Sequence, residues 1–327
     1  MRRREFFTVL GGAAAGWPLA ARSQQPQRRI GVLMNAAADD PEGQARIAAF
    51  HQGLQELGWT LGRNARIDAR WGAVDADSSR RYAAELVGLA PDVILASASA
   101  AVGALQQTTR TIPIVFTSVA DPVGAGFVET LAHPGGNITG FSTFEYTLSG
   151  KWLELLKEIA PSVTRAAVLR DASVGSGVGQ YAIIQAVAPS LGVELRAIDV
   201  RDPGEIERAI VTFAQSPNGG LIIAGSPEAV VHRNLIISLA AHHQLPAVYC
   251  LPYFARSGGL IAYGPDTVSP YRRAAQYVDR ILKGQKPADL PVQAPTQYEL
   301  VINLKTAKTF GITLPDTVLA RASEVIE

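Results

Sequence analysis

Short apolar runs alternate with amphipathic stretches along almost the whole chain, and this alternation constrains the fold more than any other feature of the sequence. In the first half, runs typical of buried strands are followed by stretches whose apolar residues recur at helical spacing, such as Ile47, Phe50 and Leu54. Short strands separated by such helices predict parallel sheets with helices on both faces. The expected strands are 30–34, 65–71, 92–96 and 112–116, and the expected helices are 44–57, 78–89, 100–108 and 123–131.

A second set of the same units follows the turn signal Pro-Gly-Gly-Asn at 134–137 and a strand at 138–142. Helices are expected at 151–159, 180–191, 203–215, 228–243 and 271–283, and strands at 165–170, 193–200, 220–224, 246–250, 260–264 and 297–302. Two successive sets predict an α/β protein with two Rossmann-like lobes, joined by a hinge that the chain crosses several times. We expect 28–143 with 258–296 to form lobe 1, and 144–257 with 297–327 to form lobe 2.

The first 23 residues have the features of an export signal. Three arginines at 2–4 precede a Gly- and Ala-rich apolar stretch, and small residues precede a cleavage site expected after Ser23. The stretch is too short to span a bilayer of about 30 Å. The run Arg-Arg-Glu-Phe at 3–6 resembles a twin-arginine signal, although Sec export stays open. No cysteine lies near the cleavage site for a lipid anchor, so we expect a soluble periplasmic protein.

Composition and charge exclude several classes of protein. The chain is 47% hydrophobic and 18% charged, which is typical of a globular protein with a large core. Its one cysteine, Cys250, cannot form an intramolecular disulfide, and we expect it to be buried. The net charge is +1, and because the first 23 residues carry four arginines and one glutamate, the rest of the chain has a net charge of −2. No nucleic-acid partner is therefore expected.

Motifs for catalysis, cofactor binding or metal binding are not found in the sequence. It has neither a Gly-x-x-x-x-Gly-Lys-Ser/Thr loop nor a Gly-x-Ser-x-Gly elbow. The Gly-rich run at 175–179 departs from the dinucleotide-binding spacing, so we interpret it as a flexible loop between the lobes. His242 and His243 are adjacent on a helix and point in different directions, which makes a poor metal pair. We expect no catalytic residues, no cofactor and no metal, and hence no enzyme.

Several local runs resemble one protein family. They are Asp-Val-Ile at 92–94, Ile-Pro-Ile-Val-Phe at 112–116, Asp-Pro-Val at 121–123, His-Pro-Gly-Gly-Asn-Ile-Thr-Gly at 133–140, Tyr-Gly-Pro at 263–265, Tyr-Arg-Arg-Ala-Ala at 271–275, and the longer runs 282–291 and 299–308. With these runs the chain resembles, beyond its signal, the ABC transporter substrate-binding family that includes the tryptophan- and tyrosine-type (TrpX-like) proteins. The resemblance implies a type I periplasmic-binding fold, a small-molecule ligand and an ABC permease of the inner membrane as partner. We expect the protein to be a monomer.

The ligand site is expected where the carboxyl ends of the strands face each other across the two lobes. Hydroxyls and amides at helix starts suit a ligand carboxylate, a nearby Asp suits an ammonium group, and aromatic rings suit a flat ligand. The candidate ligand-binding residues are Asn35, Ser97, Ser99, Thr117, Asp121, Ser173, Ser226 and Tyr263. For each polar one of them, an ordinary helix cap is an open alternative.

These features predict the solute-binding component of an ABC uptake transporter, which binds a small amino acid-like or aromatic acid ligand between its lobes. Two alternatives stay open. One is an exported enzyme on a Rossmann-like scaffold, and the other is a ligand-sensing module that serves a receptor. A DNA-binding regulator is disfavoured, because an export signal stands where its DNA-binding helices would be.

Overall fold

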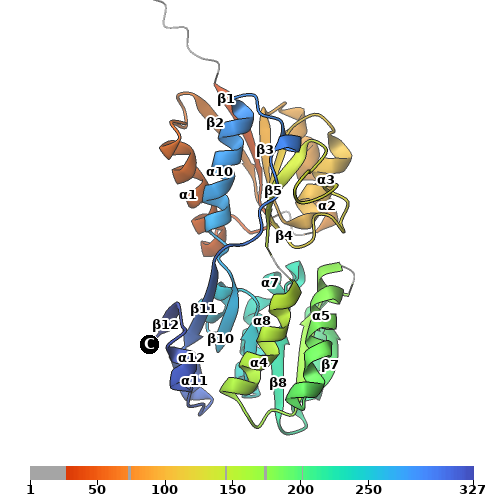
Figure 1. The fold of residues 1–327 in the computed structure, drawn as a ribbon, viewed down its shortest axis with the longest axis vertical. Helices are drawn as coiled ribbons and strands as arrows, with labels where there is room; N and C mark the ends of the chain where they lie inside the picture. The colour runs from red at the N-terminus through yellow and green to blue at the C-terminus, as the bar shows by residue number, and fades with distance from the viewer. Residues whose placement is uncertain (1–26, 73–74, 144–145, 173–174, 201) are drawn as a thin grey trace, which may run out of the picture.

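The computed structural model describes residues 27–327 except 73–74, 144–145, 173–174 and 201. The expected export signal therefore lies outside the described residues. Two α/β lobes lie one above the other, each built around its own sheet (Figure 1). Among the described residues, no helix is both long enough and apolar enough to cross a membrane.

Lobe 1, as described, holds a parallel five-stranded sheet in the order β2-β1-β3-β4-β5. Its strands are β1 (Arg28–Leu33), β2 (Ala65–Arg70), β3 (Val93–Ser97), β4 (Ile114–Val119) and β5 (Ile138–Ser142). Helices α1 (Pro41–Glu56) and α10 (Ser269–Leu282) pack on one face, and α2 (Ala76–Gly88) and α3 (Ala98–Thr108) pack on the other. Gly53 lets α1 approach α10, because a Cβ there would lie 2.7 Å from the carbonyl oxygen of Arg272.

Lobe 2 has a seven-stranded sheet within the described residues, in the order β12-β11-β10-β9-β8-β6-β7. Its strands are β6 (Arg165–Arg170), β7 (Glu194–Asp199), β8 (Gly219–Ile223), β9 (Ala247–Tyr249), β10 (Ile261–Pro265), β11 (Tyr298–Asn303) and β12 (Glu324–Ile326). All pairs are parallel except β10 with β11, which is antiparallel. Its α-helices are α4 (Ser149–Ile159), α5 (Gly175–Val187), α6 (Pro203–Ala214), α7 (Pro227–Val231), α8 (Arg233–His242), α9 (Pro252–Arg256), α11 (Leu304–Thr309) and α12 (Asp316–Leu319). Short 3-10 turns lie in lobe 2 at η1 (Tyr146–Leu148) and η2 (Ala188–Leu191), and in lobe 1 at η3 (Pro287–Asp289), which lies beside β5.

The chain crosses between the lobes after β5, after β10 and before β11 (Figure 1). The crossing segments support one another, since the amide of Asp266 donates to the carbonyl of Gln297 at 3.1 Å. The expected boundary at residue 258 is corrected by this arrangement. β10 pairs with β9 and β11 and so belongs to lobe 2, which moves the crossing to the residues after Pro265.

Three expected elements differ from the structure, each for a local reason. Residues 123–131 form turns instead of a helix, because the Asp121 carboxylate accepts the amide of Gly124 at 2.7 Å and closes a tight turn. The expected helix 228–243 is divided at His232 into α7 and α8. The Gly-rich run 175–179 is the start of α5, not a loop. Gly177 is required there, because a Cβ would lie 1.9 Å from the carbonyl oxygen of Asp171.

Candidate ligand site between the lobes

A cavity of about 260 Å³ lies between the lobes, where the loop after β1 and the start of α1 face the starts of α8 and α9. It is lined from lobe 1 by Asn35, Ala36, Ala37, Asp40, Glu42 and Arg46, and from lobe 2 by Val230, Val231, Arg233, Asn234 and Tyr253. The strand order of the lobe 1 sheet reverses at β1, and open parallel sheets bind ligands beside such a reversal. The lining combines carboxylates, guanidinium groups, amides and an aromatic ring, so it suits a small polar ligand.

Asp40 joins the two lobes. One carboxylate oxygen accepts the amides of Glu42 at 2.9 Å and Gly43 at 3.1 Å, which caps α1. The other oxygen lies 2.7 Å from the guanidinium of Arg233 on lobe 2, and the side chains are only 15% and 20% exposed. Burial acts to raise the pKa of Asp40, but the hydrogen bond and charge of Arg233 and the two amides hold it below its usual value. Asp40 is therefore a carboxylate at neutral pH.

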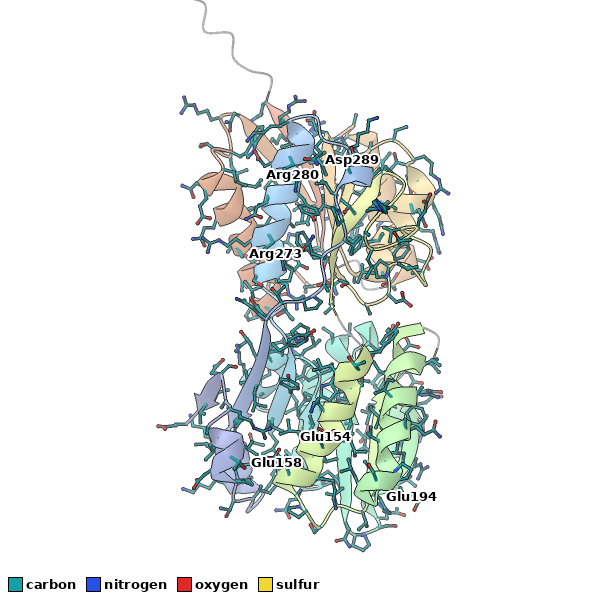
Figure 2. The ribbon with its side chains drawn as sticks, viewed as in Figure 1. Glu154, Glu158, Glu194, Arg273, Arg280 and Asp289 are labelled. Carbon is teal, nitrogen blue, oxygen red and sulfur yellow. The ribbon has the colours of Figure 1, made fainter. Side chains whose placement is uncertain are left out.

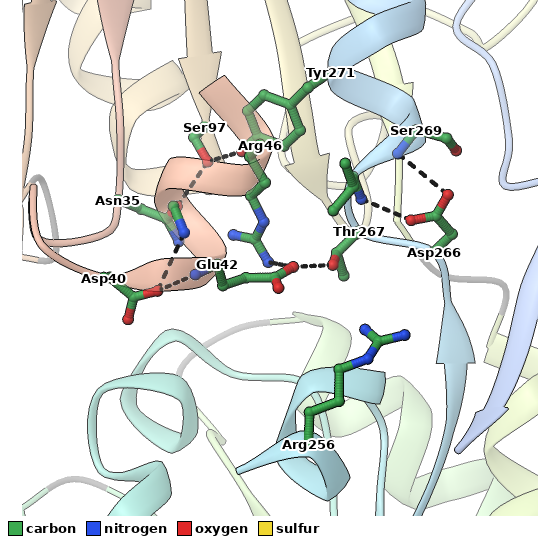
Figure 3. A network of polar contacts seen from close by, with 12 residues as sticks. Asn35, Asp40, Glu42, Arg46, Ser97, Arg256, Asp266, Thr267, Ser269 and Tyr271 are labelled. Carbon is green, nitrogen blue, oxygen red and sulfur yellow. Dashed lines mark hydrogen bonds and ion pairs between the residues drawn. The ribbon is translucent and has the colours of Figure 1, made fainter. Parts of the chain in front are cut away.

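Arg46 is a buried cation on the inner side of α1, and only 5% of its surface is exposed. Its guanidinium lies 3.3 Å from Glu42, 5.6 Å from the ring centre of Tyr253 and 5.9 Å from that of Tyr271. Burial opposes its charge, but these three neighbours raise the pKa of Arg46 above its usual value. Figure 3 shows Glu42 between Arg46 and Thr267, whose hydroxyl donates to the Glu42 carboxylate. The Arg46 Nε has no hydrogen-bond partner among the described residues.

Asn35 and Ser97, both expected in the site, are brought together by the neighbouring strands β1 and β3. The Ser97 hydroxyl lies 2.7 Å from the Asn35 Oδ1 and 2.5 Å from the Tyr271 hydroxyl (Figure 3). Ser97 precedes α3, but its side chain makes no capping bond to that helix. Its hydroxyl instead positions Asn35, which lines the cavity.

Thr117 and Ser99 lie close to this group. Thr117 lies on β4, opposite Ser97 on the neighbouring strand β3. It is fully buried, and its hydroxyl has no hydrogen-bond partner among the described residues. Ser99 is half-buried in the first turn of α3. Neither residue lines the interlobe cavity, so ligand contact by either one stays a prediction.

Asp121 makes two contacts that limit the expected role as an ammonium partner. One oxygen closes the turn to Gly124, and the other accepts the hydroxyl of Tyr146 at 3.1 Å. Tyr146 lies in η1, just after the chain enters lobe 2, so this bond also links the lobes. Burial, followed by the charge and hydrogen bond of Asp121, raises the pKa of Tyr146 to about 12. Asp121 therefore serves the turn and the hinge.

The remaining expected residues of lobe 2 are dispersed. Ser226 caps α7, with its hydroxyl 3.0 Å from the amide of Ala229. Ser173 lies outside the described residues. Glu228 follows Ser226 in α7, and burial, with a smaller effect of the nearby Asp171, raises its pKa. Beside them the carbonyl oxygen of the Gln180 side chain accepts the amide of Gly225 at 3.0 Å.

Tyr263 does not lie in the interlobe cavity. Side chains alternate along β10, and Tyr263 is on the face that α4 covers. There it lines a separate groove of about 400 Å³ whose other residues include Tyr298, Leu155 and Leu300. Figure 2 shows Glu154 and Glu158 along α4 beside this groove.

Of the candidate ligand-binding residues that the structure describes, only Asn35 lines the cavity, and its charged residues Asp40, Glu42, Arg46 and Arg233 were not predicted from the sequence. Two of them carried a local signal. Asp40 stands before Pro41, a pattern typical of a helix start. Arg46 lies one residue before Ile47 on the apolar side of α1, where a charge demands a specific environment. Among the residues that the structure describes, no cluster of metal-ligating side chains is found.

Comparisons with known proteins show what this chain is similar to. Residues 32–326 match the family model described as ABC transporter substrate binding protein. A curated tyrosine-binding protein of Clostridioides difficile is 26% identical over 292 residues, which cover 88% of this chain and 81% of that protein. The structure of an ABC domain in complex with L-Trp from Streptococcus pneumoniae is 25% identical, with a TM-score of 0.84, and the match covers 92% of this chain and 100% of that one. A conserved domain protein from Vibrio cholerae is 28% identical, also with a TM-score of 0.84, over 91% of this chain and 99% of that one.

Proposed function

Since this chain belongs to the ABC transporter substrate-binding protein family, we propose that it is a periplasmic receptor that binds an amino acid between its two lobes for an inner-membrane permease. The expected type I periplasmic-binding fold is confirmed by the two-lobed neighbours. In this fold a hinge between two lobes closes on a ligand. The protein binds its ligand and does not convert it.

The observation that carries the proposal is the charge pattern of the interlobe cavity. Its lining presents Asp40 and Glu42 beside Arg46 and Arg233, so charges of both signs face one small volume. An α-amino acid carries an ammonium and a carboxylate on the same carbon atom, and such a ligand finds a side chain of opposite charge for each group. A neutral polyol would not use these charges, although some proteins of this fold bind myo-inositol or allitol.

The relatives narrow the class of amino acid. One is a tyrosine-binding protein and another was solved with L-Trp, so we propose an aromatic amino acid as the ligand. The Tyr253 ring, which lines the cavity from lobe 2, offers a face for an aromatic side chain. Residues 1–23 are proposed to direct export to the periplasm, and the protein is proposed to act as a monomer.

A ligand panel tests the proposal. Thermal shift and calorimetry would compare L-tyrosine, L-tryptophan, other L-amino acids, aromatic acids without an amine, and polyols. A ligand at 100 times its Kd stabilises the folded state by about 2.7 kcal/mol, which gives a shift of several degrees. A shift with a polyol and none with any amino acid would overturn the assignment. Cell fractionation, with Arg3 and Arg4 each changed to Lys, tests the export route separately.

A further inference from the structure

Two arginines from opposite lobes face the interlobe cavity, and each has an N–H group that the described residues leave without a partner. Arg46 comes from α1 and Arg233 from the start of α8. The Nε atoms of both are buried, and neither has a hydrogen-bond partner among the described residues. A buried donor without an acceptor destabilises the folded protein, and more so when it belongs to a charged group.

The carboxylates of Asp40 and Glu42 do not accept hydrogen bonds from these Nε–H groups. Asp40 divides its oxygens between the amides that cap α1 and one terminal nitrogen of Arg233. One oxygen of Glu42, Oε1, lies 3.3 Å from the Arg46 guanidinium and also accepts the Thr267 hydroxyl. A further acceptor with a negative charge, placed in the cavity, would reach guanidinium groups that come from both lobes.

We propose that the carboxylate of the ligand is held between Arg46 of lobe 1 and Arg233 of lobe 2. This assignment rests on the proposed function and adds the group that the two lobes recognise together. Guanidinium groups are the side chains best suited to a carboxylate, because they donate two parallel hydrogen bonds. One ligand group then holds both lobes, so the carboxylate drives closure as well as binding.

The charge balance of the lining restricts the ligand class further. Two carboxylates and two guanidinium groups are neutral together, and a zwitterion keeps them neutral. An acid without an amine would leave a net negative charge in the cavity, and an amine without a carboxylate would leave a net positive one. Either net charge is unfavourable in a partly buried site. The site therefore selects free α-amino acids over their amides and their decarboxylated amines.

The test is a comparison of each acid with its carboxamide. Calorimetry would measure L-tyrosine against L-tyrosinamide and L-tryptophan against L-tryptophanamide, on the wild-type protein and on Arg233→Gln. The wild type is expected to bind the acids about 30- to 100-fold more tightly than the amides, the ratio that one charge-assisted hydrogen bond supplies. Arg233→Gln is expected to reduce that ratio to about five-fold or less.

Controls separate the ligand contact from loss of the ion pair with Asp40. Asp40→Ser removes the same ion pair but keeps Arg233, so the preference for the acid over the amide is expected to persist or increase, whereas Arg233→Gln loses it. Arg321→Gln removes an arginine that pairs with Glu158 outside the cavity, and it is expected to change nothing. Arg46→Lys, with folding checked by circular dichroism, tests the arginine of lobe 1.

The outcomes are distinct. If acids and amides bind the wild type within three-fold of each other, or if Arg233→Gln retains the full ratio, the carboxylate assignment is wrong and amino-acid binding stands. If no amino acid binds the wild type at all, the proposed function fails and this assignment fails with it.

Discussion

The carboxylate of Asp40 on lobe 1 lies 2.7 Å from the guanidinium of Arg233 on lobe 2, although 193 residues separate them in the chain. The bond of Asp121 to Tyr146 is a second link between the lobes. The two lobes are thus joined by side chains as well as by the three chain crossings. Because Asp40 and Arg233 also line the cavity, this ion pair lies within the site that we propose for the ligand.

Removing this ion pair is expected to favour the open form. Asp40→Ser keeps an oxygen that caps α1 but removes the carboxylate, so it isolates the link between the lobes. Affinity for the amino acid should fall by roughly 10- to 150-fold, the range for one hydrogen bond to a charged group of about 1.5–3 kcal/mol. Small-angle scattering without ligand should show a larger radius of gyration, and an unchanged radius and affinity would count against the link.

The capping role of Asp40 is measured by a second variant. Asp40→Ala removes both the ion pair and the cap, so it should lower the free energy of unfolding by about 1 kcal/mol more than Asp40→Ser. Urea denaturation of the two variants gives the difference. Equal stabilities would show that the α1 cap contributes nothing.

The Asp40 pair also gives a dependence on pH. Because its folded-state pKa is lowered, Asp40 contributes stability that is present above the unfolded pKa of about 3.9 and is lost as the pH falls through the folded pKa. Affinity for the ligand should therefore change little through this group between pH 5 and 8. The free energies of unfolding of the wild type and of Asp40→Ser should approach each other as the pH is lowered below about 4. A difference between them that stays constant down to pH 2 would contradict the pKa shift.

The sequence predicted the strands and the two-lobed plan well because buried strands need continuous apolar runs. It named Asn35 and Ser97 as candidates at strand ends, and the structure brings them together because β1 and β3 lie side by side. The contacts of Asp40 with Arg233 and of Arg46 with Tyr253 could not be predicted, because they depend on how one lobe faces the other. Tyr263 was misplaced for a different reason: a strand end was identified, but not the face on which its side chain lies.

Ser97 is expected to be structural as well as close to the site. Ser97→Ala would leave the Asn35 amide oxygen and the Tyr271 hydroxyl without their shared partner. The free energy of unfolding in urea should fall by about 1–3 kcal/mol. Ser99→Ala is the control. Ser99 lies in the first turn of α3, two residues after Ser97, and its substitution should lower the free energy of unfolding by less than about 0.5 kcal/mol. Equal effects of the two substitutions would show that the hydroxyl network does not stabilise the lobe.

The start of α5 offers a matched pair of glycines. Gly177→Ala should displace α5 from the end of β6, because its Cβ would lie 1.9 Å from the Asp171 carbonyl oxygen. A loss of about 1–3 kcal/mol in the free energy of unfolding is expected from such overpacking. Gly175→Ala has open space around its Cβ and should be neutral or slightly stabilising. Two equally tolerated alanines would mean that α5 does not need this close approach.

Glu228 is expected to make the free protein less stable as the pH rises. Its folded-state pKa is raised, first by burial and then by Asp171, so the folded protein holds this proton more tightly than the unfolded chain. Stability should therefore fall between the unfolded pKa, about 4.3, and the higher folded pKa. Glu228→Gln removes the titrating group and should raise the melting temperature at pH 7, with a smaller gain near pH 4. Melting curves across this range, with Glu194→Gln on the edge strand β7 as an exposed control, check both the sign and the pH window. A Glu228→Gln variant that is less stable than wild type at pH 7 would show that its carboxylate is paired favourably.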